Sequence, residues 1–114
     1  MVKEKFTDKI KRKNYENLCN DKNKAKDKGD YRKVAEYCNY IGEVLSQEGL
    51  YEEAIKEHKE EIHYSEISDS KIDVAVGNRK VGECLTELGE YEEALMHQRK
   101  HLKVVSKQFE CFSL

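Results

Sequence analysis

The stretch IGEVLSQEGLYEEA, at residues 41–54, recurs forty residues later as VGECLTELGEYEEA, at residues 81–94. Eight of the fourteen positions are identical in the two copies. A repeat of this period is typical of a helical solenoid, in which each unit buries its apolar face by stacking on its neighbour. The repetition therefore predicts stacked helix pairs.

The identical glycines have two different structural roles. Gly42 and Gly82 fall in the middle of predicted helices, where glycine costs about 1 kcal/mol relative to alanine, so we expect a neighbouring helix to approach closely there. Gly49 and Gly89 follow the last apolar residue of a helix, where a left-handed residue lets the chain reverse. Gly29 repeats this turn signal earlier in the chain.

Apolar residues around these glycines recur at helical spacing, which predicts helices over 31–48 and 71–88, each followed by a partner helix. Residues 65–70 read as a linker between the pairs, and Ser70 with Asp73 resembles a capping box that opens the second pair. The predicted inward-facing residues are Val34, Cys38, Ile41, Leu45, Tyr51, Ala54, Ile55 and Ile62 in the first pair, and Val74, Val81, Leu85, Leu88, Tyr91, Ala94, Leu95, Leu102 and Val105 in the second.

The predicted fold is all-α, a solenoid of about five antiparallel helices. Residues 1–30 form a basic N-terminal helix, 31–68 the first repeat, 70–108 the second repeat and 109–114 an apolar tail. We expect the N-terminal helix to pack on the first pair through Phe6, Ile10, Leu18 and Ala25. The tail lacks the polar cap with which solenoids normally end, so we expect a truncated array that self-associates or is marginally stable.

Composition narrows the function classes. The 114 residues include 39% charged residues, no proline and only short apolar runs, which excludes a membrane-spanning segment and favours uninterrupted helices. Residues 1–30 carry a charge of +4 and the remainder −6. Acidic residues interrupt the basic N-terminal run, so we do not expect direct nucleic-acid binding. The four cysteines form no close pair, and Cys38 and Cys84 are expected as reduced core residues.

No pattern of catalytic or cofactor-binding residues stands out. His97 and His101 share a helix face, but the positive charge of Arg99 and Lys100 argues against a metal there, and we expect the histidines on the surface or between helices. The paired glutamates at 52–53 and 92–93 suit helix N-termini. We expect no enzyme activity, no metal, no cofactor and no small-molecule substrate.

The order Gly-x-x-Leu-x-x-x-Gly-x-Tyr-x-x-Ala, at 42–54 and 82–94, resembles the tetratricopeptide-repeat (TPR) signature. The forty-residue period and His58 are similar to the long-helix subtype of kinesin light chains and of the Leu-Gly-Asn-repeat regulators of spindle orientation. Residues between the landmarks resemble the N-terminal repeats of Tonsoku-like proteins. These are CNYIGEVL at 38–45, YEEAIKEH at 51–58, AVGNRKVGE at 75–83 and ALMHQ at 94–98.

This resemblance implies a nuclear scaffold that acts with a partner protein at stalled or broken replication forks. The family's ankyrin repeats, which read histones, and its leucine-rich repeats do not fit within 114 residues, so histone reading is not carried over. The alternative is a cytoplasmic peptide-binding adaptor of the spindle-orientation or motor-cargo type.

The TPR resemblance also implies where a partner would bind. In TPR arrays the first helix of each pair lines the concave face, which here gives four outward-pointing candidates: Asn39, Glu43, Arg79 and Glu83. Arg79 suits a partner carboxylate, and Asn39 suits an extended backbone.

Overall fold

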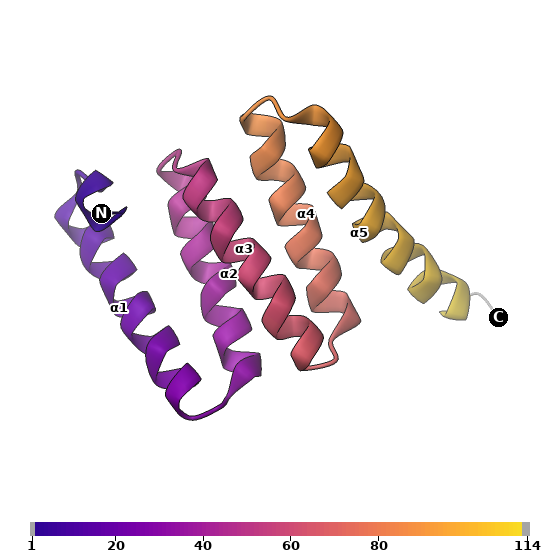
Figure 1. Cartoon of the computed structure of the whole chain (residues 1–114), viewed down its shortest axis with the longest axis horizontal. Coiled ribbons are helices and arrows are strands. Elements are labelled where there is room, and N and C mark those ends of the chain that lie inside the picture. Colours follow the sequence, from indigo (N-terminus) through magenta and orange to yellow (C-terminus); the bar gives the residue numbers. More distant parts are fainter. Residues whose placement is uncertain (1, 113–114) are drawn as a thin grey trace.

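The computed structural model describes the backbone of residues 2–112 and the side chains of residues 2–103. A short 3₁₀ helix, η1 (Val2–Lys5), precedes five α-helices. These are α1 (Lys9–Asp27), α2 (Tyr31–Gln47), α3 (Tyr51–Ile67), α4 (Lys71–Glu87) and α5 (Tyr91–Phe112). Consecutive helices run antiparallel and follow one another across the molecule (Figure 1). The prediction of an all-α, TPR-type solenoid of five helices is confirmed.

The helices lie in two layers. Side chains link α1 to α3 and α3 to α5 on one side, through Lys22–Glu57 and Lys59–Glu93, and α2 to α4 on the other side, through Glu43–Lys80. The shortest extent of the molecule is 18 Å, close to the thickness of two packed helices. Helices two positions apart are therefore neighbours within a layer, as stacking in a solenoid requires.

Four three-residue turns of one kind join the helices. The residue with positive φ is Gly29, Gly49, Asp69 or Gly89, so the turns recur every twenty residues. In each turn the next amide donates to a carbonyl five residues back, for example Leu50 to Leu45, which closes a Schellman motif. The predicted linker at 65–70 is too long, because α3 continues to Ile67 and Asp69 takes the left-handed position.

Most predicted core positions of the first pair are buried, including Val34, Cys38, Ile41 and Leu45. The predicted N-cap is confirmed, since the Ser70 hydroxyl accepts from the Asp73 amide at 3.3 Å, but the reciprocal bond of a capping box is not formed: the Asp73 carboxylate accepts from the Ser70 hydroxyl, and the Ser70 amide donates to the Ser65 carbonyl. In the second pair, Val81, Leu85 and Ala94 are buried and Val74 is half-buried. The predicted packing of Leu88, Tyr91, Leu95 and Leu102 is wrong, because all four are exposed.

The N-terminal segment differs in detail from the prediction. Phe6 is fully buried, but it precedes α1 and stacks on Tyr15 at 5.1 Å between ring centroids. Ile10 is 82% exposed, so it does not pack on the first pair. Ala25 is buried and Leu18 half-buried, as expected. The side chains of Val105 and of residues 109–114 lie outside the described residues, although the backbone of α5 continues through Phe112.

Candidate protein-binding groove

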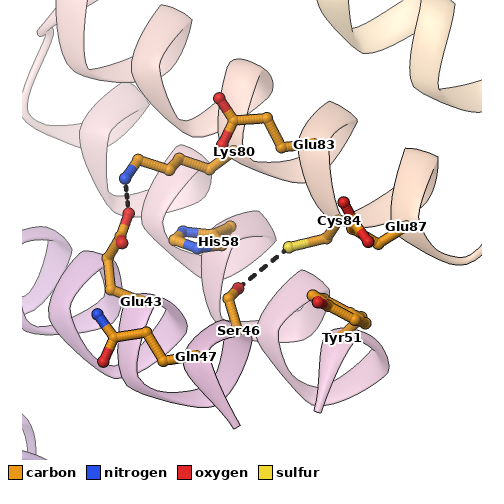
Figure 2. Close-up of a pocket in the computed structure, with 9 residues that line it drawn as sticks. All are labelled: Glu43, Ser46, Gln47, Tyr51, His58, Lys80, Glu83, Cys84 and Glu87. Carbon is orange, nitrogen blue, oxygen red and sulfur yellow. Dashed lines mark hydrogen bonds and ion pairs between the residues drawn. The ribbon is translucent and has the colours of Figure 1, made fainter. Parts of the chain in front are cut away.

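A groove lies between α2 and α4, with α3 beneath it (Figure 2). Its volume is about 400 Å³, which suits a few side chains of a bound segment. Nine residues from the three helices line it: Glu43, Ser46, Gln47, Tyr51, His58, Lys80, Glu83, Cys84 and Glu87. We call it the α2–α4 groove.

The floor of the groove is formed by His58, which is contacted from two sides. Its Nδ1 lies 2.8 Å from a carboxylate oxygen of Glu61, and both side chains are buried. Gly42 packs directly on the imidazole, so closely that a Cβ at this position would overlap the ring. The predicted close approach at Gly42 is confirmed, and it is what admits His58 between the helices.

Two contacts cross the groove and hold its walls together. Lys80 on α4 forms an ion pair with Glu43 on α2, and Ser46 Oγ lies 3.3 Å from Cys84 Sγ (Figure 2). Burial raises the pKa of the Cys84 thiol above its ordinary value. The neutral thiol is therefore the favoured form of Cys84, which serves as a wall residue of the groove.

The α4 rim of the groove carries negative charge. Glu83 accepts a hydrogen bond from Arg79 at 3.2 Å, and Glu87 lines the groove one turn later. Lys80 already faces Glu43, so its charge is compensated. Arg79 compensates Glu83 in the same way, so the carboxylate in excess on this rim is Glu87, which makes the rim suited to hydrogen-bond donors or cations.

The structure brings together two of the four predicted partner-binding residues. Glu43 and Glu83, equivalent positions in the two repeats, both line the groove. Arg79 lies beside it through its bond to Glu83. Asn39 does not line the groove; it lies one turn before Glu43 on α2, and its Oδ1 is buried without a hydrogen-bond partner among the described residues.

Sequence reasoning missed most of the lining, namely Ser46, Gln47, Tyr51, His58, Lys80, Cys84 and Glu87. A signal was present for His58: the buried positions Ala54, His58, Glu61 and Ser65 follow one another at steps of four, three and four. This spacing is that of an inward-facing helix stripe, and polar residues on such a stripe point to a buried hydrogen-bond pair.

One group of side chains has the composition of a metal site. Ligand atoms of Cys38, Glu57 and Glu60 lie within 4.8 Å of one another. However, the ammonium of Lys22 lies 2.9 Å from both carboxylates and takes the position of a cation. Burial also raises the pKa of the Cys38 thiol to about 12, which disfavours the thiolate that a metal requires. The group is an ion-pair network between α1 and α3.

Within residues 2–112, no helix combines the length and the apolar character that crossing a membrane would need.

Comparisons with known proteins give one consistent result. The chain is 37% identical to the Tonsoku-like protein of Bos taurus over 83 residues, or 73% of the chain, and 38% identical to that of Mus musculus over 81 residues, or 71%. The Tonsoku-like protein of Danio rerio is 45% identical over 59 residues, or 52% of the chain. No protein-family model matches the chain. No solved structure matches it either.

The alignments cover a small part of each relative: 6% of the bovine and mouse proteins and 4% of the zebrafish protein. The similarity thus concerns one helical segment of much longer proteins. It agrees with the resemblance carried by the residues between the repeat landmarks, and over most of its length this chain is related to a segment of the Tonsoku-like proteins.

Proposed function

We propose that the chain is a non-catalytic TPR segment that binds a protein partner in the α2–α4 groove. The observation that carries this proposal is the groove itself, which two helices of equivalent repeats form around a fixed floor. Glu43 and Glu83 present the same side chain forty residues apart on its two walls. Acceptors on both walls suit an extended segment whose free N–H groups lie between them.

The charge of the rim narrows the chemistry of that segment. Glu83 and Glu87 offer acceptors, so the bound segment brings cationic side chains or free N–H donors. Arg79 can release Glu83 and turn to a carboxylate of the same partner, since both side chains of this pair are about half exposed.

We also propose a cellular role for this binding activity: the chain acts in the nucleus, as part of a scaffold for repair of replication forks and DNA double-strand breaks. Its support is the similarity to Tonsoku-like proteins over about 70% of the chain. The alternative, a cytoplasmic adaptor of the spindle-orientation or motor-cargo type, is supported by the forty-residue period alone.

Quantitative affinity capture from nuclear and cytoplasmic extracts tests the groove. The baits are the wild-type chain, Glu83→Ala, Arg79→Ala and, as a control of equal charge change away from the groove, Glu52→Ala. We expect Glu83→Ala to reduce recovery of the main partner about tenfold, as for loss of a charge-assisted bond, and Glu52→Ala to leave it unchanged. Equal recovery by all four baits would reject the groove as the binding surface.

Localisation separates the two cellular roles. A fluorescent fusion is imaged in cells with stalled replication forks and in mitotic cells. Recruitment to sites of stalled replication supports the repair role, whereas recruitment to the spindle or to the cell cortex supports the adaptor.

A further inference from the structure

The side of the molecule opposite the α2–α4 groove has two valleys. The first, between α1 and α3 over α2, is filled by ion pairs. Lys22 Nζ lies 2.9 Å from carboxylate oxygens of both Glu57 and Glu60, and Lys26 Nζ lies 2.9 Å from the second oxygen of Glu60. Cys38 lies beside these charges. This valley therefore holds its own cations against its own carboxylates.

The second valley, between α3 and α5 over α4, has different residues at the equivalent positions. The residues forty positions after Lys22, Lys26, Cys38, Glu57 and Glu60 are, in order, Ile62, Glu66, Asn78, His97 and Lys100. The carboxylates that received a lysine are thus replaced by an imidazole and an ammonium. No charged side chain stands where Lys22 enters the first valley.

As a result, the second valley is open. It encloses about 430 Å³ and is lined by Lys59, Ile62, Glu66, Val74, Asn78, His97, Lys100 and Lys103. We call it the α3–α5 valley. Lys59 forms an ion pair with Glu93 at 3.7 Å, and neither Lys100 nor Lys103 forms an ion pair with a described side chain. Glu93 compensates Lys59, so Lys100 and Lys103 against Glu66 leave the valley with an excess of positive charge.

His97 supplies a buried polar group in this valley. The amide of Asn78 is oriented by its Nδ2, which donates to the Val74 carbonyl at 3.1 Å, so its Oδ1 faces His97 Nδ1 at 2.8 Å. His97 Nδ1 therefore carries the proton and donates. Nε2, whose nearest carboxylate is Glu93 at 4.0 Å, is the nitrogen left for a ligand.

The surroundings of His97 disfavour its charged form. Burial and then the charges of Lys100 and Lys59 lower the pKa of His97 below its ordinary value, against the weaker opposing effect of Glu93. Glu66 also lines the valley, while the α4 residues there, Val74 and Asn78, are uncharged. An anion bound among the lysines would reverse the balance and favour the imidazolium.

We propose that the α3–α5 valley binds carboxylate side chains of an acidic protein segment. The first valley shows that lysines and carboxylates pair at this position of the fold. There the carboxylates belong to α3 and the lysines to α1. In the α3–α5 valley the lysines belong to α3 and α5, and the carboxylates would come from the partner. This surface is separate from the α2–α4 groove, so the chain can hold a basic segment on one side and an acidic segment on the other.

The probe is a fluorescein-labelled hexaglutamate peptide blocked at its other end, with hexaglutamine as the uncharged reference. Binding to the 114-residue chain is measured by anisotropy for wild type, Lys100→Gln, Lys103→Gln and Lys33→Gln, an exposed lysine of α2 outside the valley. We expect Kd to rise about fivefold for each valley variant and less than twofold for Lys33→Gln. Equal weakening by Lys33→Gln would overturn the proposal, because it indicates general charge attraction.

Titration of His97 by NMR gives a second test. The pKa of His97 should respond to a bound peptide only if the peptide lies in the valley, and it should not respond if the lysines have a purely structural role. Saturation with hexaglutamate should raise the pKa of His97, while hexaglutamine leaves it unchanged. An unchanged His97 pKa under saturation would overturn the proposal. So would displacement of the peptide by a short DNA duplex or by inorganic phosphate at equal charge concentration, since the valley would then serve nucleic acid or any small anion.

Discussion

The two helix pairs have nearly the same sequence pattern and different surroundings. Ile55 on α3 is 9% exposed and belongs to a core cluster that includes Leu85 of α4, whereas its counterpart Leu95 on α5 is 47% exposed. Likewise, Tyr51 on α3 is half-buried and its counterpart Tyr91 on α5 is exposed. In a solenoid the burial of a position is set by the next helix, so one repeat pattern yields a core on α3 and an apolar surface on α5.

Removing equivalent side chains should give the largest difference between the pairs. Ile55→Ala leaves a cavity between α3 and α4 and should lower the free energy of unfolding by about 3 kcal/mol. Leu95→Ala removes an exposed side chain and should cost less than about 1 kcal/mol. Urea unfolding followed by circular dichroism measures both. Similar losses would show that α5 is covered in solution.

Substitution of the two helix-centre glycines should give the second-largest difference in the free energy of unfolding. Gly42→Ala drives a Cβ into His58, which is buried and held by Glu61, and should cost about 2 kcal/mol. At Gly82 an added Cβ would meet Gln98 Cγ at 3.0 Å, in a side chain that can turn away, and the backbone carbonyl oxygen of Ala94 at 3.2 Å. The helix preference of alanine, about 1 kcal/mol, then offsets part of the crowding, so Gly82→Ala should destabilise the chain less than Gly42→Ala. Thermal melts of the two variants compare them, and a larger loss at Gly82 would contradict the packing described.

The ion pairs of the first valley should contribute less to the free energy of unfolding than the core packing does. Lys22→Met leaves Glu57 and Glu60 without their shared cation and should cost about 1.5 kcal/mol, against no measurable change for Lys24→Met, an exposed lysine of the same helix. Chemical unfolding of the two variants at neutral pH measures the difference. Equal stability of Lys22→Met and wild type would show that the first valley is held by apolar contacts alone.

The pH dependence of this network has a definite sign. Burial opposes the charge of Lys22, but its bonds to the glutamates outweigh burial and raise the pKa of Lys22. The contribution of Lys22 to the free energy of unfolding is therefore complete below pH 10.5 and is lost as pH rises past that value. Burial likewise opposes the charge of Glu60, yet Lys26 and Lys22 lower its pKa, so that contribution is present above pH 4.5 and lost below it. Lys22→Met should therefore weaken both the alkaline and the acid dependence of the free energy of unfolding.

The smallest effect is expected at the helix starts. Ser70 caps α4 through its hydroxyl, whereas Leu50, at the equivalent position of α3, makes no side-chain cap bond. Ser70→Ala should cost about 1 kcal/mol and Leu50→Ala should show no cap loss, only that of its packing. Hydrogen exchange at the first amides of α4 would localise the change, and unchanged exchange there would contradict it.

The sequence was sufficient for the helices and most turns because glycines mark the turns and apolar spacing marks the helices. It misplaced the end of α3 because Asp69, with φ of 56°, takes the position that glycine holds in the other three turns. Asp tolerates this conformation better than most residues, and the twenty-residue spacing of the turns was the available signal.

The exposed stripe of α5 and the lining of the groove were less accessible to prediction. An apolar pattern records which face of a helix is suited to burial, but it does not record whether a neighbour is present. Leu102 and Leu95 therefore read as core although they are exposed. Lys80, Cys84 and Glu87 became groove residues only through the distance between α2 and α4, which is a tertiary property.

Site-specific photo-crosslinking tests the proposed binding surface most directly. A benzophenone amino acid replaces Gln47, an exposed residue of the α2–α4 groove, or Lys56, an exposed residue of α3 outside it. Binding in the groove predicts one dominant crosslinked protein from position 47, lost when Glu83→Ala is added, and no such product from position 56. Equal products from both positions, or a product at 47 that persists with Glu83→Ala, would contradict it.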